Sequence, residues 1–258
     1  MKSLRLFACA LAAASSIGAV RASGADNDGR VYEMRVYYAA PGKLDALNAR
    51  FRDHTAKLFE KHGMTNVGHS LPVDNKDSKL VYFLSYPSRE AREASWQAFS
   101  KDPAWQAARK ASEVDGKLLS KVEARFLQTT DYSPKLEIND VGGRVFEMRT
   151  YTASPGNLAA LNARFRNHTV KLFEKHGMTN VVYWNYMPDQ QGHEKMLVYL
   201  LAHKDQASAK ASFDAFRGDA DWVQARAASE EKAGGSLTEK QGGVVSEFLK
   251  PTDYSPLK

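Results

Sequence analysis

A stretch of 23 residues occurs twice in this chain of 258 residues and constrains its fold more than any other feature. Residues 44–66 read LDALNARFRDHTAKLFEKHGMTN, and residues 158–180 read LAALNARFRNHTVKLFEKHGMTN. Twenty of the 23 positions are identical. A repeat at this spacing indicates two copies of one structural unit of about 110 residues, which is an ordinary domain size.

Each copy predicts the same order of elements. In the first copy, residues 30–38 alternate as a strand, and Pro41-Gly42 turns the chain into a helix that ends near Gly63. Further strands are predicted at residues 65–71, 80–86 and 121–127, with helices at residues 88–99 and from Asp102-Pro103 onward. The order strand, helix, strand, strand, helix, strand is the βαββαβ arrangement of a ferredoxin-like α+β sandwich.

A ferredoxin-like unit leaves one face of its sheet uncovered by helices, and two such faces commonly meet. Two tandem copies can meet within one chain, which predicts an intramolecular pseudo-dimeric α/β barrel with its helices outside. Two separate domains, each pairing with another chain, are the alternative, and a homodimer is compatible with either arrangement.

The N-terminal residues predict export. Lys2 and Arg5 precede the apolar run of residues 6–20, and a small residue, Ala22, marks a cleavage site, so residues 1–22 are predicted to be a signal peptide. Residues 23–29 then form a polar leader. Cleavage removes Cys9, the only cysteine, and lowers the formal charge from +6 to +3. We therefore expect a periplasmic or secreted protein without disulfides, without a stable membrane span in the mature chain and without nucleic acid as a partner.

The repeated helix carries polar side chains beside its apolar stripe of Leu47, Phe51 and Leu58. They are Asn48, His54 and Thr55 in the first copy and Asn162, His168 and Thr169 in the second. These residues could line a pocket in which a histidine acts as base, acid or ligand. Alternatively, each histidine bonds a backbone carbonyl at the edge of the core. Both interpretations stay open, with His54 and His168 as candidate catalytic residues.

The other histidines and the known motifs give no metal site. His62 and His176 precede a glycine and are predicted to cap the end of their helix. A zinc site from His54 and His62 fails because eight residues of helix rise about 12 Å. No HExxH, phosphate-binding loop, GxSxG or CxxC motif occurs.

The first strand of each copy carries a second set of candidates on one face. Glu33, Arg35 and Tyr37 alternate with the predicted core face of Tyr32, Met34, Val36 and Tyr38, and the second copy repeats them as Glu147, Arg149 and Tyr151. If this polar face points into a closed barrel, its charges must satisfy one another. The alternatives are a structural ion-pair ladder or an anion-binding lining built on the arginines.

The two copies have diverged unevenly. Residues 80–99 match residues 197–216 at only 8 of 20 positions, and His69 in one copy corresponds to Tyr183 in the other. Two pockets, one in each copy, need not be equivalent.

The segments YEMRVYYAAPGKLDALNARFRDH, LFEKHGM and LVYFLSYPSREAREASWQAFSKDPAW resemble the NIPSNAP family. The resemblance holds in both copies, which we place at residues 30–134 and 144–258, with residues 135–143 as a linker. It implies the dimeric α/β-barrel superfamily, which includes cofactor-free monooxygenases and haem proteins. It supplies no catalytic residues for this chain. Known eukaryotic members are associated with mitochondria and act through protein partners, whereas this chain has an export-type signal.

The function expected from the sequence is binding of a small apolar or aromatic ligand, or of a protein partner, because no strong catalytic motif is present. A cofactor-independent monooxygenase or isomerase that uses a histidine of the repeated helix is the enzyme alternative. No cofactor is predicted, although haem bound through one of these histidines is a further alternative.

Overall fold

The computed structural model describes residues 29–258. The predicted signal peptide and nearly all of the leader lie outside these residues. Within the described part of the chain, no helix is both long and apolar enough to cross a membrane.

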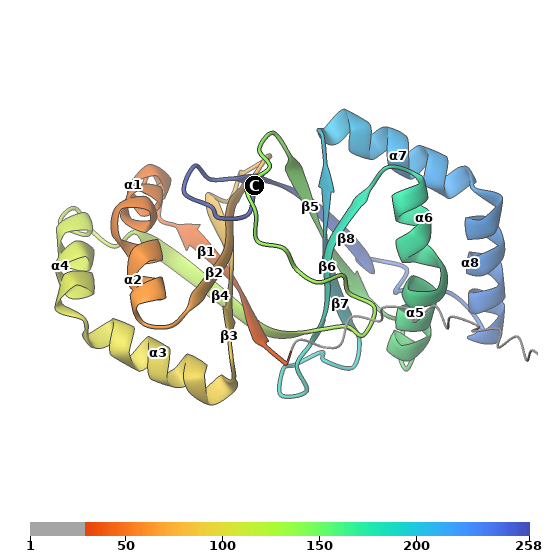
Figure 1. Cartoon of the computed structure of the whole chain (residues 1–258), viewed down its shortest axis with the longest axis horizontal. Helices are drawn as coiled ribbons and strands as arrows, with labels where there is room; N and C mark the ends of the chain where they lie inside the picture. Colours follow the sequence, from red (N-terminus) through yellow and green to blue (C-terminus); the bar gives the residue numbers. More distant parts are fainter. Residues whose placement is uncertain (1–28) are drawn as a thin grey trace, which may run out of the picture.

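The two halves contain the same elements in the same order (Figure 1). The first half comprises β1 (Val31–Ala39), α1 (Leu44–Arg50), η1 (Phe51–Thr55), α2 (Ala56–Lys61), β2 (Thr65–Pro72), β3 (Lys79–Tyr86), α3 (Arg89–Lys101), α4 (Pro103–Ser112) and β4 (Leu119–Thr129). The second comprises β5 (Val145–Thr152), α5 (Leu158–Arg164), η2 (Phe165–Thr169), α6 (Val170–Lys175), β6 (Thr179–Tyr186), β7 (Met196–His203), α7 (Gln206–Gly218), α8 (Ala220–Lys232) and β8 (Val244–Pro251).

The eight strands close into one barrel in the order β1-β3-β2-β8-β5-β7-β6-β4, and all neighbours pair antiparallel. Two short seams join the halves: β2 pairs with β8 around Leu71 and Lys250, and β4 pairs with β6 around Gln128 and Asn185. Helices cover the outside of each half (Figure 1). The predicted pseudo-dimeric barrel is confirmed, and it closes within a single chain.

Large apolar side chains fill the inside of the barrel. Tyr32, Met34 and Val36, which alternation places on one face of the first strand, point inward. Trp184 from the second half packs on both Tyr32 and Phe83 of the first, with ring centroids 5.5 and 5.1 Å apart. The two halves therefore share one core, since side chains of each interleave across the barrel.

A second layer of aromatic side chains lies between each sheet and its helices. In the first half, Phe51 and Phe59 pack on Tyr82, with ring centroids 5.1 and 6.1 Å apart, and Phe59 also packs on Phe99 at 4.9 Å. The corresponding strand β7 is likewise buried along nearly its whole length. The strand predicted at residues 80–86 is confirmed as part of β3, and it is buried on both faces.

The repeated helix is not a regular α-helix, which corrects the predicted stripe. Its middle turns, η1 and η2, are π-helical, and the backbone N–H of Ala56 bonds the carbonyl of Phe51 five residues earlier. The wider turn rotates the residues that follow it. Phe59 is therefore fully buried, whereas Leu58, which α-helical spacing assigns to the stripe, is only half-buried.

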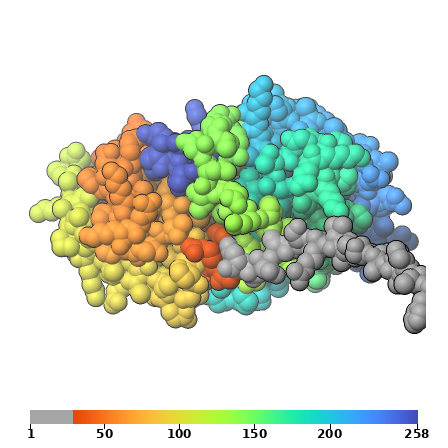
Figure 2. Space-filling view, viewed as in Figure 1, coloured from red at the N-terminus to blue at the C-terminus, as the bar shows by residue number. Residues whose placement is uncertain are grey.

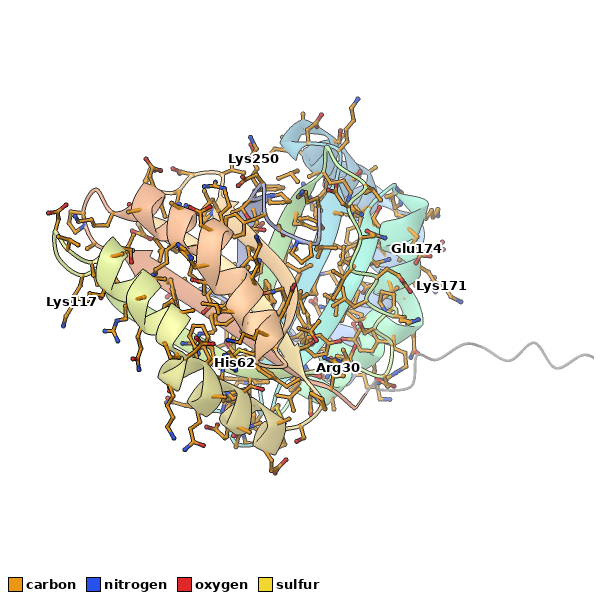
Figure 3. The ribbon with its side chains drawn as sticks, turned by 60° about the vertical axis from the view of Figure 1, so that its left-hand side comes forward. Arg30, His62, Lys117, Lys171, Glu174 and Lys250 are labelled. Carbon is orange, nitrogen blue, oxygen red and sulfur yellow. The ribbon has the colours of Figure 1, made fainter. Side chains whose placement is uncertain are left out.

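Asp102 and Asp219, which cap the N-termini of α4 and α8, connect these helices to the end of the repeated helix. Asp102 caps α4 by accepting the N–H of Ala104 at 2.7 Å, and it also contacts Nε2 of His62 at 2.7 Å. His176 contacts Asp219 in the same way at 2.7 Å. His62 lies where the repeated helix ends beside α3 and α4 (Figure 3). Its imidazole thus binds the residue that caps α4.

Candidate functional site

The two candidate histidines lie at the protein surface. His54 and His168 belong to η1 and η2, and both side chains are exposed. The neighbouring Thr55 and Thr169 are buried, and their hydroxyls donate to the carbonyls of Arg50 and Arg164, at 3.1 and 3.2 Å. The threonine hydroxyls therefore serve the π-helical turn itself.

Asn48 and Asn162 contact the opposite half of the molecule. Oδ1 of Asn48 accepts a hydrogen bond of 2.8 Å from the hydroxyl of Tyr254, which follows the last strand of the second half. Oδ1 of Asn162 accepts the same bond, also 2.8 Å, from Tyr132, which follows the last strand of the first half. Each asparagine therefore bonds the tyrosine of the TDYSP segment that closes the other repeat.

Further contacts fix these closing segments, residues 130–134 and 252–256. The N–H of His69 donates to Oγ of Ser255 at 2.9 Å, and the N–H of Tyr183 donates to Oγ of Ser133 at 3.0 Å. The C-terminal residues, dark blue, lie between the orange helix of the first half and the green linker (Figure 2). The halves therefore exchange their ends across the two seams of the barrel.

The charged face of the first strand points outward, toward the helices and not into the barrel. Glu33 is fully buried beneath α3, where Arg35 reaches Oε1 at 2.5 Å and Arg92 reaches the same oxygen at 2.8 Å. The hydroxyl of Tyr86 donates to Oε2 at 2.9 Å. Burial alone would raise the pKa of Glu33, but the hydrogen bond from Arg92 and the positive charge of Arg35 outweigh it and hold that pKa below 4.5.

The second half carries a different version of this network. Arg149 pairs with Glu147 at 2.5 Å, and His203 and Ser246 occupy the remaining positions around the carboxylate, at 3.1 and 2.5 Å. Burial opposes ionisation, yet the hydrogen bond from His203 and the charge of Arg149 lower the pKa of Glu147. Tyr37 and Tyr151 each accept a bond of 3.3 Å from the arginine of their own strand. In both halves the arginines are engaged by protein partners.

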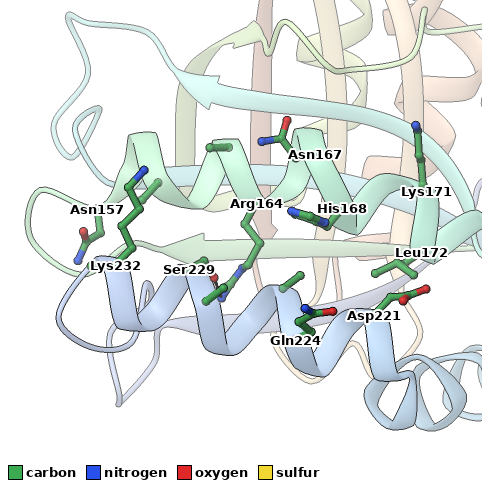
Figure 4. A pocket seen from close by; sticks show the side chains of 15 residues that line it. Asn157, Arg164, Asn167, His168, Lys171, Leu172, Asp221, Gln224, Ser229 and Lys232 are labelled. Atoms are coloured by element: carbon green, nitrogen blue, oxygen red, sulfur yellow. Dashed lines mark hydrogen bonds between the residues drawn. The ribbon is translucent and has the colours of Figure 1, made fainter.

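A surface groove runs between the repeated helix of the second half and α8 (Figure 4). Its volume is about 850 Å³. Side chains of alanine line much of it, at positions 160, 163, 225, 228 and 233. His168 faces α8 across this groove (Figure 4). It is the one of the two candidate histidines that lines the groove.

Charged residues flank the alanines of this groove. Arg164 reaches across it from α5 to α8, where it lies 3.5 Å from Oε1 of Glu230. Lys171 and Lys232 are exposed and line the groove as well. Asp221, an acidic residue of the lining, lies 3.4 Å from Lys175. The arrangement combines an apolar surface with exposed ammonium groups, which suits a ligand with an apolar body and a negative charge.

A smaller cavity of about 500 Å³ lies beside the docked end of the second half. Asn48, Arg52, Leu71 and Asp253 line it. In the second half, Asn185 stands at the position that corresponds to Leu71, and its Oδ1 accepts a bond of 3.0 Å from Asn162. The two ends of the barrel therefore differ in polarity at this position.

The model of the NIPSNAP family matches this chain twice, over residues 32–134 and residues 146–256. The chain belongs to the NIPSNAP family. Two solved NIPSNAP structures match part of the chain. A NIPSNAP family protein from Agrobacterium tumefaciens is 23% identical, covers 41% of this chain and 98% of its own, and gives a TM-score of 0.37. An uncharacterized NIPSNAP domain protein from Burkholderia xenovorans is 22% identical, with coverages of 41% and 99% and a TM-score of 0.36.

Two further structures match the tandem NIPSNAP barrel over most of its length. A putative monooxygenase from Fusobacterium nucleatum is 10% identical, covers 86% of this chain and 92% of its own, and gives a TM-score of 0.55. An anthrone oxidase-like protein is 14% identical, with coverages of 87% and 92% and a TM-score of 0.53. These proteins share the fold. No curated protein matches the chain.

Sequence reasoning missed two features of the NIPSNAP halves. The exchange of closing segments had a signal, because TDYSP occurs at the end of both copies, but its partner lies in the other half and no local pattern reveals it. The groove beside α8 depends on how α5 and α8 pack, and α8 carries little helical amphipathicity to indicate its buried face.

Proposed function

We propose that this NIPSNAP protein binds a small amphipathic anion, such as an aromatic or aliphatic carboxylate, in the groove between α5–η2–α6 and α8. The observation that carries the proposal is the combination of alanines with Lys171, Lys232 and His168 in one groove of about 850 Å³. This volume lies in the range of roughly 300–1,000 Å³ typical of small-molecule sites. The apolar body would lie on the alanines, and the anionic group would meet the ammonium or imidazole groups.

Close packing between the repeated helix and its sheet favours the outer groove as the ligand site. Phe51, Phe59 and Tyr82 pack closely there, so a ligand in that layer would have to displace aromatic side chains from the core. A ligand in the outer groove displaces only water. The proposal therefore moves the ligand expected from the sequence to the outer side of the repeated helix.

Titration with an amphipathic aromatic anion, 8-anilinonaphthalene-1-sulfonate, tests the groove directly by calorimetry and fluorescence. Lys171→Glu should weaken binding about tenfold, because a charge-assisted contact of roughly 1.5 kcal/mol is lost. Lys57→Glu, at the corresponding position of the first half, should leave binding unchanged. Equal losses in both variants, or no binding by the wild type, would refute the proposal.

A groove-filling pair of variants gives an independent readout. Ala228→Trp should block the site by placing an indole over the alanines, whereas Ala111→Trp, the matching change on α4, should not. Both residues are exposed, so neither change disturbs the core. Decanoate should compete with the aromatic anion for the wild type if the site accepts carboxylates in general.

Proton transfer by His168 is a second candidate function, favoured by the position of its imidazole in the same groove. The names of two structures that share the fold, a putative monooxygenase and an anthrone oxidase-like protein, suggest an oxidation as the first reaction to assay, and an isomerisation is the alternative expected from the sequence. His168→Ala should lower any turnover of a bound aromatic substrate, whereas His54→Ala should not. Unchanged turnover in the double variant removes both histidines from the reaction.

Haem is a further ligand to test, because both candidate histidines are exposed and an imidazole can hold a haem iron. A haem group would supply an iron centre that one imidazole holds. Addition of haemin to the wild type and to His168→Ala distinguishes the cases: a Soret shift lost in the variant supports ligation, and no shift in the wild type removes the idea.

We also propose that the protein is exported, on the strength of the charged, apolar and small residues in the order found at residues 2–22. Expression in a Gram-negative host should give a product that begins at Ser23 in the periplasmic fraction. A product that keeps its first 22 residues and stays in the cytoplasm would contradict export.

A further inference from the structure

Position 69 on β2 and position 183 on β6 are equivalent in the two halves but carry different residues. His69 stacks on Tyr82, its partner in the strand register, with ring centroids 5.6 Å apart and planes inclined by 20°. Tyr183 stacks on Tyr199 in the same way, at 4.9 Å and 24°. Both rings are completely buried.

The rest of the surroundings is the same in both halves. His69 contacts the rings of Phe51 and Tyr254. Tyr183 contacts the corresponding rings of Phe165 and Tyr132. The two halves therefore differ at this position but have the same kinds of aromatic residue around it.

In the second half, the phenol hydroxyl completes a hydrogen-bond set. Tyr183 donates to Oδ1 of Asn180, and Nδ2 of that amide donates to the carbonyl of Val170 at 3.0 Å and to Glu174 at 3.2 Å. Every polar atom of the Asn180 side chain has a partner. The amide thus links the end of the repeated helix to β6.

In the first half, the amide keeps its orientation but its oxygen has no protein partner. Nδ2 of Asn66 donates to the carbonyl of Ala56 at 2.9 Å and to Glu60 at 3.1 Å, so Oδ1 faces the same way as in Asn180. Oδ1 of Asn66 and both ring nitrogens of His69 are buried without a hydrogen-bond partner from the described residues. Buried polar atoms are rarely left in that state.

The shape of imidazole explains the mismatch. An imidazole ring is shorter than a phenol. His69 therefore does not fill the outer part of the volume that the hydroxyl of Tyr183 occupies in the second half. Two hydrogen bonds of about 2.8 Å, joined at a bent angle, span roughly 5 Å. One water molecule therefore matches the difference between the two side chains, and a buried water needs two to four polar partners.

We propose that the first half binds one buried water molecule between Asn66 and His69, at the position that the Tyr183 hydroxyl takes in the second half. The water donates one hydrogen to Oδ1 of Asn66 and forms a second hydrogen bond with the ring nitrogen of His69 that faces it. Burial holds the pKa of His69 near 3, so the ring is neutral and one of its nitrogens can accept. The two halves thus close the same contact with different chemistry.

A high-resolution crystal structure of the wild type tests the proposal directly. It should show an ordered solvent peak within hydrogen-bond distance of both Asn66 and His69. A direct bond between the two side chains, with no peak between them, would overturn it.

Two variants provide a second measurement. His69→Tyr should carry its hydroxyl to Asn66 and displace the water, whereas His69→Phe displaces the water without replacing its hydrogen bond. We expect a melting temperature about 2–4 °C higher for the tyrosine than for the phenylalanine variant. Equal melting temperatures would show that Oδ1 of Asn66 needs no donor and would count against the site.

Discussion

Arg52 and Asp253 are 201 residues apart in sequence and form a two-pronged ion pair, with Nε 2.6 Å from Oδ2 and Nη2 2.8 Å from Oδ1. Arg166 and Asp131 repeat this pair at the other end of the barrel. Both pairs are exposed, so each adds little to stability. Their geometry instead sets how the closing segment of one half lies on the helix of the other.

This exchange gives a structural reason for the near identity of the two helices. The repeated segment supplies the docking surface for a TDYSP segment in each half, and that segment is itself the same in both copies. Asn48, Phe51 and Arg52 all contact Tyr254 or Asp253. The helix meets the same partner twice and so has the same side chains twice.

Removal of the tyrosine hydroxyl should weaken the junction between the halves. We expect Tyr254→Phe to lower the free energy of unfolding by about 1 kcal/mol, because a largely buried bond to Asn48 is lost. Urea unfolding followed by far-UV circular dichroism measures the change. A double-mutant cycle with Asn48→Ala isolates the bond, and a coupling energy near zero would contradict its role.

The sequence was sufficient for the architecture because the alternation of residues 30–38 and the nearly all-apolar residues 80–86 reflect burial that is encoded locally in each strand. The sequence did not reveal whether the face of β1 that carries Glu33 points into the barrel or toward the helices. Both faces of β1 are buried, one in the barrel and one under α3, so alternation alone cannot say which side holds the charges.

The repeated helix shows a second limit of sequence reasoning. A π-helical turn at Phe51–Thr55 adds a residue to the turn, and Thr55 stabilises it with a bond to the carbonyl of Arg50. A helical wheel drawn at α-helical spacing lacks this extra residue, so positions beyond Phe51 drift around the helix. The exposure of His54 and His168 could not be read from the pattern for that reason.

Acid should lower the stability of the folded protein through the buried imidazole of His69. Because the pKa of His69 is lowered to about 3, the unfolded chain binds a proton below pH 6.5 that the folded protein does not bind. Stability from this group is therefore present above pH 6.5 and is lost as the pH falls toward 3, by about 1.4 kcal/mol per pH unit.

The variant His69→Tyr isolates that contribution, since tyrosine does not titrate in this range. Its unfolding free energy should depend less on pH between 6.5 and 3 than that of the wild type, by close to one bound proton. Urea midpoints collected along a pH series measure both slopes. Identical slopes would mean that His69 takes up its proton while the protein is still folded.

Neutralisation of Glu33 should be costly at neutral pH and progressively less so in acid. Glu33→Gln leaves Arg35 and Arg92 in a buried site without their carboxylate, which we expect to cost about 3 kcal/mol at pH 7. The pKa of Glu33 is lowered by folding, so its contribution is complete above pH 4.5 and is lost as the pH falls through the lower, folded value. The wild type should therefore approach the variant in stability below pH 4.5, as its own carboxylate becomes protonated.

Glu93→Gln is the matched control, because Glu93 also contacts Arg92, at 3.0 Å, but is 65% exposed, and its loss should change stability by less than about 1 kcal/mol. A constant difference between wild type and Glu33→Gln across the acid range would show that the carboxylate is not the group that Arg35 and Arg92 require.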